Sequence, residues 1–334
     1  MSNDVNDKLF NQGFGISKNA GPGMDKPLFA RNVFPPFSTW NTREGRWLDR
    51  RRRWAGLGIE SEIGRDVVTY NIAGINNYQK QGKSKGAKTQ KSGDNFKPDK
   101  GMKLISIFDP VVCELAYRWW AKPGDIVLDP FAGGSVRGIV ASVMGLKYYG
   151  IELREEQVVA NRAQINDKTT GKFKPRWVVG DSLVEAPKAP ECDFIFSCPP
   201  YGDLEVYSDD EADISNKGYA RFLELYREII AASVARLKED TFAVWVVGNY
   251  RDKKTGRMLD FVGDSVRAFE DAGMSYYNDI VLINSVGTGS LRANTSFLRG
   301  RRKMVKLHQN VLVFYKGDWK KAADRLPQDL ANYS

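Results

Sequence analysis

Two short stretches rich in glycine or proline each follow a run of strand-like apolar residues, and they constrain the fold more than any other feature. The first follows 126–128 and reads Asp129-Pro130-Phe131-Ala132-Gly133-Gly134-Ser135. The second follows 193–196 and reads Ser197-Cys198-Pro199-Pro200-Tyr201. A turn directly after a buried strand lies at its carboxyl end, where open α/β sheets bind their ligands. The two stretches therefore predict one site at one edge of a parallel sheet.

Strand-like apolar runs alternate with helix-like stretches from residue 104 onward. The expected strands are 126–128, 147–151, 177–179, 193–196, 242–247, 276–284 and 310–315. The expected helices between them are 112–120, 136–144, 155–166, 219–237 and 261–272. This alternation is typical of a doubly wound α/β fold. We predict a mainly parallel, seven-stranded, Rossmann-like sheet within a catalytic domain that spans 102–320.

The residues before this domain have a different composition. We expect a basic and aromatic N-terminal extension over 1–73, a Lys/Gly-rich linker over 74–101 and, after the domain, a tail over 321–334. The extension contains a helix-like stretch at 43–57 with arginines between tryptophans, a pattern that suits phosphate contact and stacking on unpaired bases. Its predicted nucleic-acid contacts are Arg50, Arg51, Arg52 and Arg53. The alternative is an amphipathic helix packed on the catalytic domain.

Charge also favours a nucleic-acid partner. The net charge is +9, and a basic protein gains sequence-independent affinity by neutralising phosphates. The insertion 287–309 contains no acidic residue and is a candidate for target recognition. Its predicted nucleic-acid contacts are Arg292, Arg299, Arg301, Arg302 and Lys303. The alternative is a basic loop without a binding role.

Acidic residues end three successive predicted strands: Asp129, Glu152 and Asp181, the last followed by Ser182. Asp129 suits an ammonium group, Glu152 suits the two hydroxyls of a ribose, and Asp181 suits an adenine amine. The glycine spacing differs from G-x-G-x-x-G, so a dinucleotide is not indicated. S-adenosylmethionine carries an ammonium, a ribose and an adenine but no phosphate. Each carboxylate alone equally suits a helix N-cap or a turn.

The second stretch favours chemistry on a base amine. Its two prolines lack N–H donors, so their carbonyls stay free as acceptors. Acceptors on the protons of an exocyclic amine favour the lone pair that attacks a methyl sulfonium, and Tyr201 offers a face on which the base can stack. The alternative is a rigid loop without a catalytic role.

Other classes of protein are disfavoured. The chain has no run of 18 apolar residues, so we expect no membrane span. Three cysteines and one histidine suggest neither a disulfide framework nor a zinc site. We expect a metal-free cytoplasmic protein of a bacterial or phage-infected cell.

The two stretches resemble the motifs D-P-F-x-G-S/G and D/N/S-P-P-Y/F of DNA amino-methyltransferases, which make N6-methyladenine or N4-methylcytosine. Phe108 and Asp109 stand where such enzymes often contact the methionine end of the cofactor. The similarity covers 104–316, and the wider chain resembles phage or prophage methylases of restriction-modification type. The resemblance implies S-adenosylmethionine as cofactor, duplex DNA with a flipped base as substrate, adenine as the first target and cytosine as the second. It makes Ser197 to Tyr201 the catalytic residues.

One position departs from the family pattern. Cys198 stands directly before the prolines, where the family has Asp, Asn or Ser, and Ser197 is one residue earlier. A thiol is a weak acceptor, so either the Pro199 carbonyl or the Ser197 hydroxyl would hold the target amine. The alternatives are an RNA base-amine methyltransferase, an inactive DNA-binding or anti-restriction protein, and a cysteine nucleophile as in 5-methylcytosine enzymes.

Overall fold

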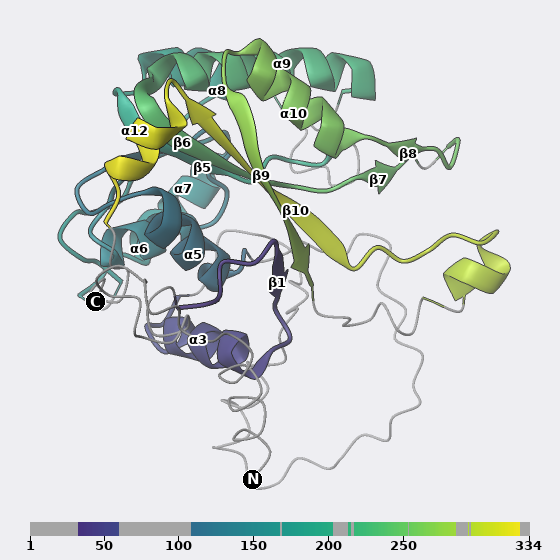
Figure 1. Ribbon diagram of the computed structural model, residues 1–334, viewed down its shortest axis with the longest axis horizontal. Coiled ribbons are helices and arrows are strands. Elements are labelled where there is room, and N and C mark those ends of the chain that lie inside the picture. Colours follow the sequence, from purple (N-terminus) through teal and green to yellow (C-terminus); the bar gives the residue numbers. More distant parts are fainter. Residues whose placement is uncertain are drawn as a thin grey trace, which may run out of the picture.

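The computed structural model describes residues 33–59, 108–167, 169–202, 213–214, 217–252, 254–284, 293 and 295–327, which contain an eight-stranded sheet between layers of helices (Figure 1). Its strands are β1 (Thr39–Asn41), β2 (Ile126–Asp129), β3 (Lys147–Glu152), β4 (Arg176–Val179), β5 (Cys192–Ser197), β6 (Leu237–Val247), β9 (Ser275–Ile283) and β10 (His308–Lys316). A separate hairpin pairs β7 (Tyr250–Arg251) with β8 (Met258–Leu259). The predicted linker 74–101 lies outside the described residues.

The strand order is β1-β9-β10-β6-β5-β2-β3-β4. All seven predicted strands are present, and the pairs from β6 to β4 are parallel. Only β10 runs antiparallel, to both β6 and β9. The predicted doubly wound fold is therefore confirmed. From β2 the chain moves outward to β3 and β4 and then returns to β5 on the other side of β2. This reversal is a topological switch point, where such sheets bind ligands.

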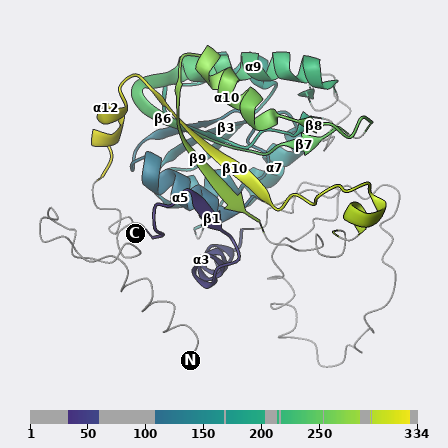
Figure 2. The same ribbon diagram turned by 45° about the vertical axis from the view of Figure 1, so that its right-hand side comes forward.

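Helices cover both faces of the sheet, as Figures 1 and 2 show from two directions. One face carries α5 (Pro110–Trp120) and α6 (Val136–Val143), and the other carries α9 (Tyr219–Arg236) and α10 (Phe261–Asp271). The remaining helices are α3 (Gly45–Ala55), α7 (Glu155–Ala163), α8 (Ser182–Glu185) and α12 (Trp319–Asp324).

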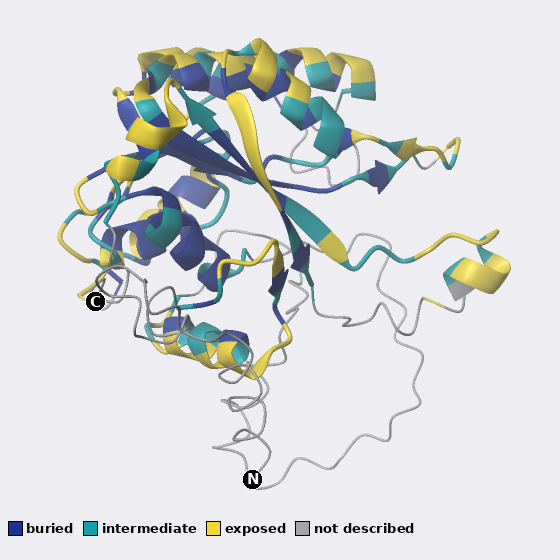
Figure 3. Ribbon diagram, in the orientation of Figure 1, coloured by how far each residue is buried: buried dark blue, intermediate teal, exposed yellow. Residues whose placement is uncertain are grey.

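The central strands β2 and β5 are buried on both faces, whereas β9 is exposed along its first five residues (Figure 3). Val127 contributes to the core under α5, whereas its neighbour Leu128 contributes to the core under α9. Successive strand residues point to opposite faces, so strands covered on both sides are apolar throughout.

The N-terminal extension contributes directly to this fold. β1 pairs in parallel with β9 and adds an eighth strand that the sequence did not predict. The rings of Trp40 and Trp47 are buried, and the Trp40 ring lies 5.4 Å from Trp119 and 6.3 Å from Trp120. Residues 33–59 therefore share a core with α5.

Two of the arginines predicted to bind nucleic acid face α5. Arg50 donates to Glu114 Oε2 at 2.8 Å and pairs with Oε1, while Arg51 pairs with Asp109. The indole of Trp54 also donates to Glu114, at 2.9 Å. These guanidinium groups compensate carboxylates next to the core, and nucleic-acid contact by Arg50 and Arg51 stays a prediction. The alternative, an amphipathic helix packed on the domain, describes α3. Arg52 and Arg53 remain exposed.

We expect Glu114→Gln to lower the free energy of unfolding by about 2 kcal/mol at pH 7, because hydrogen bonds to charged groups contribute about 1.5–3 kcal/mol. Burial alone raises the pKa of Glu114, but Arg50 and Trp54 lower it overall from its ordinary 4.5. Because the pKa of Glu114 is lower in the folded than in the unfolded state, its charge stabilises the folded state at pH values above the unfolded-state pKa. This stabilisation is lost as the pH falls through the folded-state pKa. Urea titrations should show a smaller difference at pH 3 than at pH 7. An equal difference at both would contradict the assignment.

Within the described residues no helix is long and apolar enough to cross a membrane, and no group of three His, Cys, Asp or Glu side chains is placed to hold a metal ion.

Candidate active site

Asp129 ends β2 with its side chain fully buried and surrounded by donors. Its Oδ2 accepts from Arg137 Nε and from the Tyr148 hydroxyl, each at 2.6 Å. Its Oδ1 accepts from Ser197 Oγ at 2.5 Å and from the Phe131 amide at 3.2 Å. Both of its oxygens accept from protein donors, and contact between this carboxylate and a ligand ammonium stays a prediction. Asp129 holds β2, β3 and β5 together at the switch point.

Arg137 lies in the first turn of α6, and no sequence motif identified it. Besides Asp129, it donates to the carbonyls of Phe131 and Ala132, and its guanidinium lies 4.8 Å from the centre of the Phe108 ring. Burial would lower the pKa of Arg137, but the Asp129 carboxylate raises it overall. Arg137 is therefore a permanent cation that fixes the backbone of the glycine-rich turn.

The glycine-rich turn meets the end of β3. Gly133 has φ +54°, which favours glycine, and its amide donates to Glu152 Oε2 at 2.9 Å. Asn161 of α7 donates to the Gly133 carbonyl at 2.8 Å, and Ser135 Oγ donates to Gln164 at 3.0 Å. Two predicted cofactor segments thus lie in contact, and α7 supplies supporting amides that the sequence did not single out.

Glu152 ends β3 beside the glycine-rich turn. Its Oε1 accepts from the Arg154 amide at 3.1 Å and lies 3.7 Å from Arg154 Nε. The side chain is 13% exposed. Contact between this carboxylate and a ligand stays a prediction.

Asp181 and Asp109 both act as helix N-caps. Asp181 Oδ1 accepts from the Leu183 amide at 2.9 Å at the start of α8, and Ser182 Oγ donates to the Pro130 carbonyl. Asp109 accepts from the Val111 amide at 3.0 Å and from Trp47 Nε1 at 2.8 Å, and it pairs with Arg51. The Asp109 side chain thus connects α3 to the start of α5, and its cofactor role stays a prediction.

The catalytic stretch begins at the end of β5. Ser197 is fully buried and its hydroxyl donates to Asp129, and contact between this hydroxyl and a target amine stays a prediction. Cys198, Pro200 and Tyr201 are half-buried and Pro199 is buried. Of the two acceptors considered, the Pro199 carbonyl is the one that the buried network does not use.

Tyr201 is connected to the far end of the sheet. Its ring packs edge-on against Tyr250 and Phe261, with centroids 6.1 Å and 5.9 Å away. Its hydroxyl accepts from Gln309 Nε2 at 2.5 Å. Gln309 is the second residue of β10 and the last residue of the predicted insertion 287–309. A contact across 108 residues of sequence carries no local signal.

We expect Tyr201→Phe and Gln309→Leu to lower turnover by similar factors, about three- to tenfold, because each removes the same hydrogen bond of about 1 kcal/mol. The double variant should be no worse than either single one, which is the signature of one shared interaction. Asn310→Leu is the matched control. Asn310 lies on β10 next to Gln309, but it donates to Asp279 of β9, at 2.9 Å. Additive losses in kcat would contradict the coupling.

The described part of the basic insertion is exposed. A π-helical turn, η4 (Thr295–Arg299), precedes Arg301, Arg302 and Lys303, and all of these cations including Arg299 reach solvent. Arg292 lies outside the described residues. Nucleic-acid contact by this segment stays a prediction.

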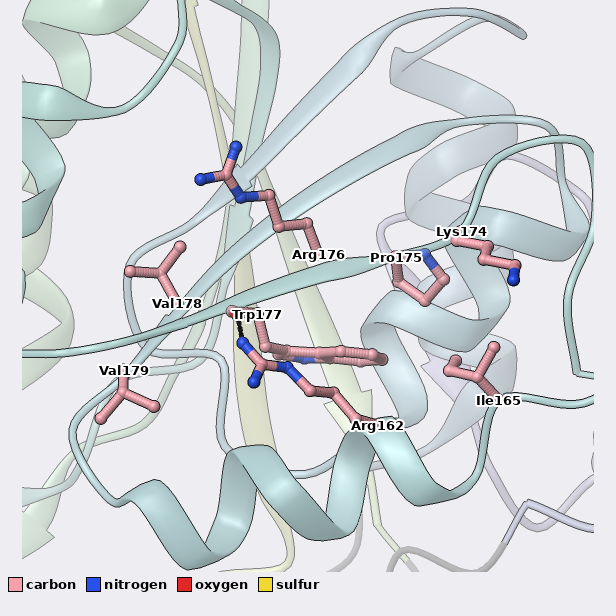
Figure 4. A pocket seen from close by; sticks show the side chains of 8 residues that line it. All are labelled: Arg162, Ile165, Lys174, Pro175, Arg176, Trp177, Val178 and Val179. Atoms are coloured by element: carbon pink, nitrogen blue, oxygen red, sulfur yellow. Dashed lines mark hydrogen bonds between the residues drawn. The ribbon is translucent and has the colours of Figure 1, made fainter.

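A pocket of about 670 Å³ lies away from this site, along the edge strand β4 (Figure 4). It is lined by Arg162, Ile165, Lys174, Pro175 and the four residues of β4. Arg162 donates to the Trp177 carbonyl at 2.7 Å across it. None of the predicted site residues lines this pocket. The candidate site is therefore placed at the carboxyl ends of β2, β3 and β5.

Comparison with known proteins gives several partial similarities. A tRNA (guanine(10)-N2)-dimethyltransferase of Pyrococcus abyssi is 31% identical over 146 residues, 43% of this chain and 43% of that protein. The DNA adenine methyltransferase YhdJ of Escherichia coli is 53% identical over 38 residues, 11% of this chain and 13% of that protein. The chain thus matches less than half the length of either. The crystal structure of TrmN from Thermus thermophilus is similar with a TM-score of 0.41 and 16% identity, covering 63% of this chain and 49% of that one.

A family model described as DNA methylase, of the N6/N4 type, matches residues 114–162. The matched segment runs from α5 into α7 and contains the whole glycine-rich turn with Asp129, Arg137 and Glu152. These partial matches make the chain similar to N6-adenine/N4-cytosine DNA methylases over the segment that carries the glycine-rich turn.

Proposed function

We propose that this protein is an S-adenosylmethionine-dependent methyltransferase that methylates an exocyclic base amine of DNA, adenine N6 first and cytosine N4 second. The 2.5 Å hydrogen bond from Ser197 to Asp129 carries the proposal. It joins the first residue of the proline-containing stretch to the first residue of the glycine-rich turn, 68 positions apart. Both stretches therefore open at the same switch point of the sheet.

The residues around the turn fit this cofactor. Gly133 lets the backbone approach a ligand closely, and the Glu152 carboxylate beside it is an acceptor of the type that ribose hydroxyls need. Phe108 offers an apolar ring at the same place, held over Arg137. The bound cofactor supplies a methyl group on a sulfonium. In this proposal Asp129 and Arg137 shape the site without touching the ligand.

The proline-containing stretch would orient the target base. The Pro199 carbonyl accepts an N–H of the amine, and Tyr201 stacks on the base. The bound cofactor would supply the methyl group that the amine nitrogen takes up. The amine then releases a proton to water. Acceptors at its N–H groups raise the nucleophilicity of the nitrogen before the attack.

DNA is favoured over RNA by the family match, and the net charge of +9 suits either. RNA is the second candidate, because the tRNA methyltransferase of Pyrococcus abyssi matches a longer stretch than the DNA enzyme of Escherichia coli, 146 against 38 residues.

The test is nucleoside mass spectrometry on unmodified genomic DNA and on total RNA, each incubated with purified protein and S-adenosylmethionine. We expect N6-methyladenine or N4-methylcytosine in the DNA. A methylated nucleoside in RNA alone would select the second candidate. Cofactor binding without any product would favour an inactive binding protein.

A further inference from the structure

Residues 295–307, here termed the basic arm, are a described part of the predicted insertion 287–309 that the proposed function does not use. It leads into β10, where Gln309 contacts the hydroxyl of Tyr201. Figures 1 and 2 both show the basic arm and the β7–β8 hairpin projecting from the same side of the sheet. The two approach each other at Lys303, whose Nζ would lie 3.9 Å from a side-chain carbon placed at Gly256. The basic arm is thus tied to the catalytic stretch.

The basic arm exposes apolar side chains among its cations. Met304 and Leu298 are 74% and 66% exposed, more than any other large apolar side chain among the described residues. Phe297 is 39% exposed, and the Arg302 guanidinium lies 5.0 Å from its ring centre. The segment has no acidic residue. Exposed apolar side chains among cations fit a partner with anionic phosphates on its outside and apolar base faces inside, as a base-paired duplex has.

The backbone of the basic arm holds this tip in one shape. Arg301 and Arg302 have φ of 59° and 64°, a left-handed conformation that is uncommon for residues other than glycine. The Arg302 amide donates to the Phe297 carbonyl at 2.8 Å, and the Lys303 amide donates to the Ser296 carbonyl at 3.2 Å. These hydrogen bonds close a turn that carries Leu298 within η4. Arg299 follows Leu298 directly, and Arg301 and Arg302 lie close behind it in sequence. Such strained turns cluster at functional sites.

We propose that the basic arm enters the base stack of duplex DNA and that Leu298 fills the space left by the flipped base. This inference rests on the proposed function and names the way in which the same site reaches its target. Apolar side chains that enter base steps replace part of the lost stacking, and flanking cations hold the phosphates. The contribution is needed only when a base must leave a duplex, because a single strand presents its bases directly.

The experiment compares initial methylation rates on one genomic DNA, used as duplex and after heat denaturation to single strands. Leu298→Ala should lower the duplex rate about tenfold and the single-strand rate less than twofold. Leu298→Phe should keep the duplex rate, whereas Leu298→Lys should not, although it adds a cation. Val184→Ala is the control, since Val184 is 51% exposed on α8 outside the basic arm.

Equal losses on both substrates, or none on the duplex, would overturn the inference. Full duplex activity of Leu298→Ala together with lost binding to vesicles of 30% phosphatidylserine in phosphatidylcholine would assign the tip to a membrane surface instead. Failure of the proposed function looks different, because the unaltered protein would then methylate neither form of DNA.

Discussion

Arg137→Leu should lower the free energy of unfolding by about 3–5 kcal/mol, because it leaves the Asp129 carboxylate buried without its cation. Arg137 Nε lies 2.6 Å from Asp129 Oδ2, and the two side chains are 6% and 0% exposed. The same change frees the carbonyls of Phe131 and Ala132, so cofactor affinity should fall below detection even where the protein remains folded. Urea titration and calorimetry with S-adenosylmethionine measure the two effects.

Two further variants make this prediction specific. Asp129→Asn in the Arg137→Leu background removes the unpaired charge and should recover part of the lost stability. Arg267→Leu removes a pair with Asp264, 2.8 Å apart, in which the arginine is 52% exposed, and it should cost less than about 1 kcal/mol. If Arg137→Leu were as mild as Arg267→Leu, the buried pair would not organise the turn.

Glu152→Gln should raise the dissociation constant for S-adenosylmethionine by about 10- to 100-fold, because a hydrogen bond to a charged acceptor contributes about 1.5–3 kcal/mol. The amide oxygen of Gln still accepts from the Gly133 amide, so the turn should keep its shape. Calorimetry gives the affinity, and a thermal melt without cofactor checks that the fold is retained.

Glu156→Gln is the matched control for this change. Glu156 pairs with the same Arg154, at 3.2 Å, but its side chain is 62% exposed and belongs to the solvent side of α7. The Glu156→Gln variant should bind S-adenosylmethionine with the affinity of the unaltered protein. An unchanged affinity for Glu152→Gln as well would remove Glu152 from the proposed ribose site.

The strands were predictable from sequence because burial on both faces makes them short apolar runs separated by turns. β1 was not, because three residues carry no period and their partner, β9, lies far along the chain. The strand-end positions of Asp129, Glu152 and Asp181 were also predictable. The hydrogen-bond donors that contact these carboxylates were not predictable, because the sequence around a strand-end carboxylate is the same whether it faces a ligand or a buried arginine.

The arginines of α3 show the same limit. A run of four arginines between tryptophans suggests solvent and phosphate, yet Arg50 and Arg51 face Glu114 and Asp109. Position on the helix decides this, because residues three and four apart share a face. Trp47, Arg50, Arg51 and Trp54 are such neighbours. The partner helix is about 60 residues away, beyond the reach of any local pattern.

The pairing of β1 with β9 has a consequence for synthesis on the ribosome. Thr39 pairs with Val281, so the partner emerges 242 residues later (281 minus 39). At roughly 5–20 residues per second, β1 waits on the order of 10 to 50 seconds for its partner strand. During that interval the Trp40 side chain lacks the sheet edge that its strand later joins. A nascent chain of this protein should therefore depend on chaperones until translation has passed β9.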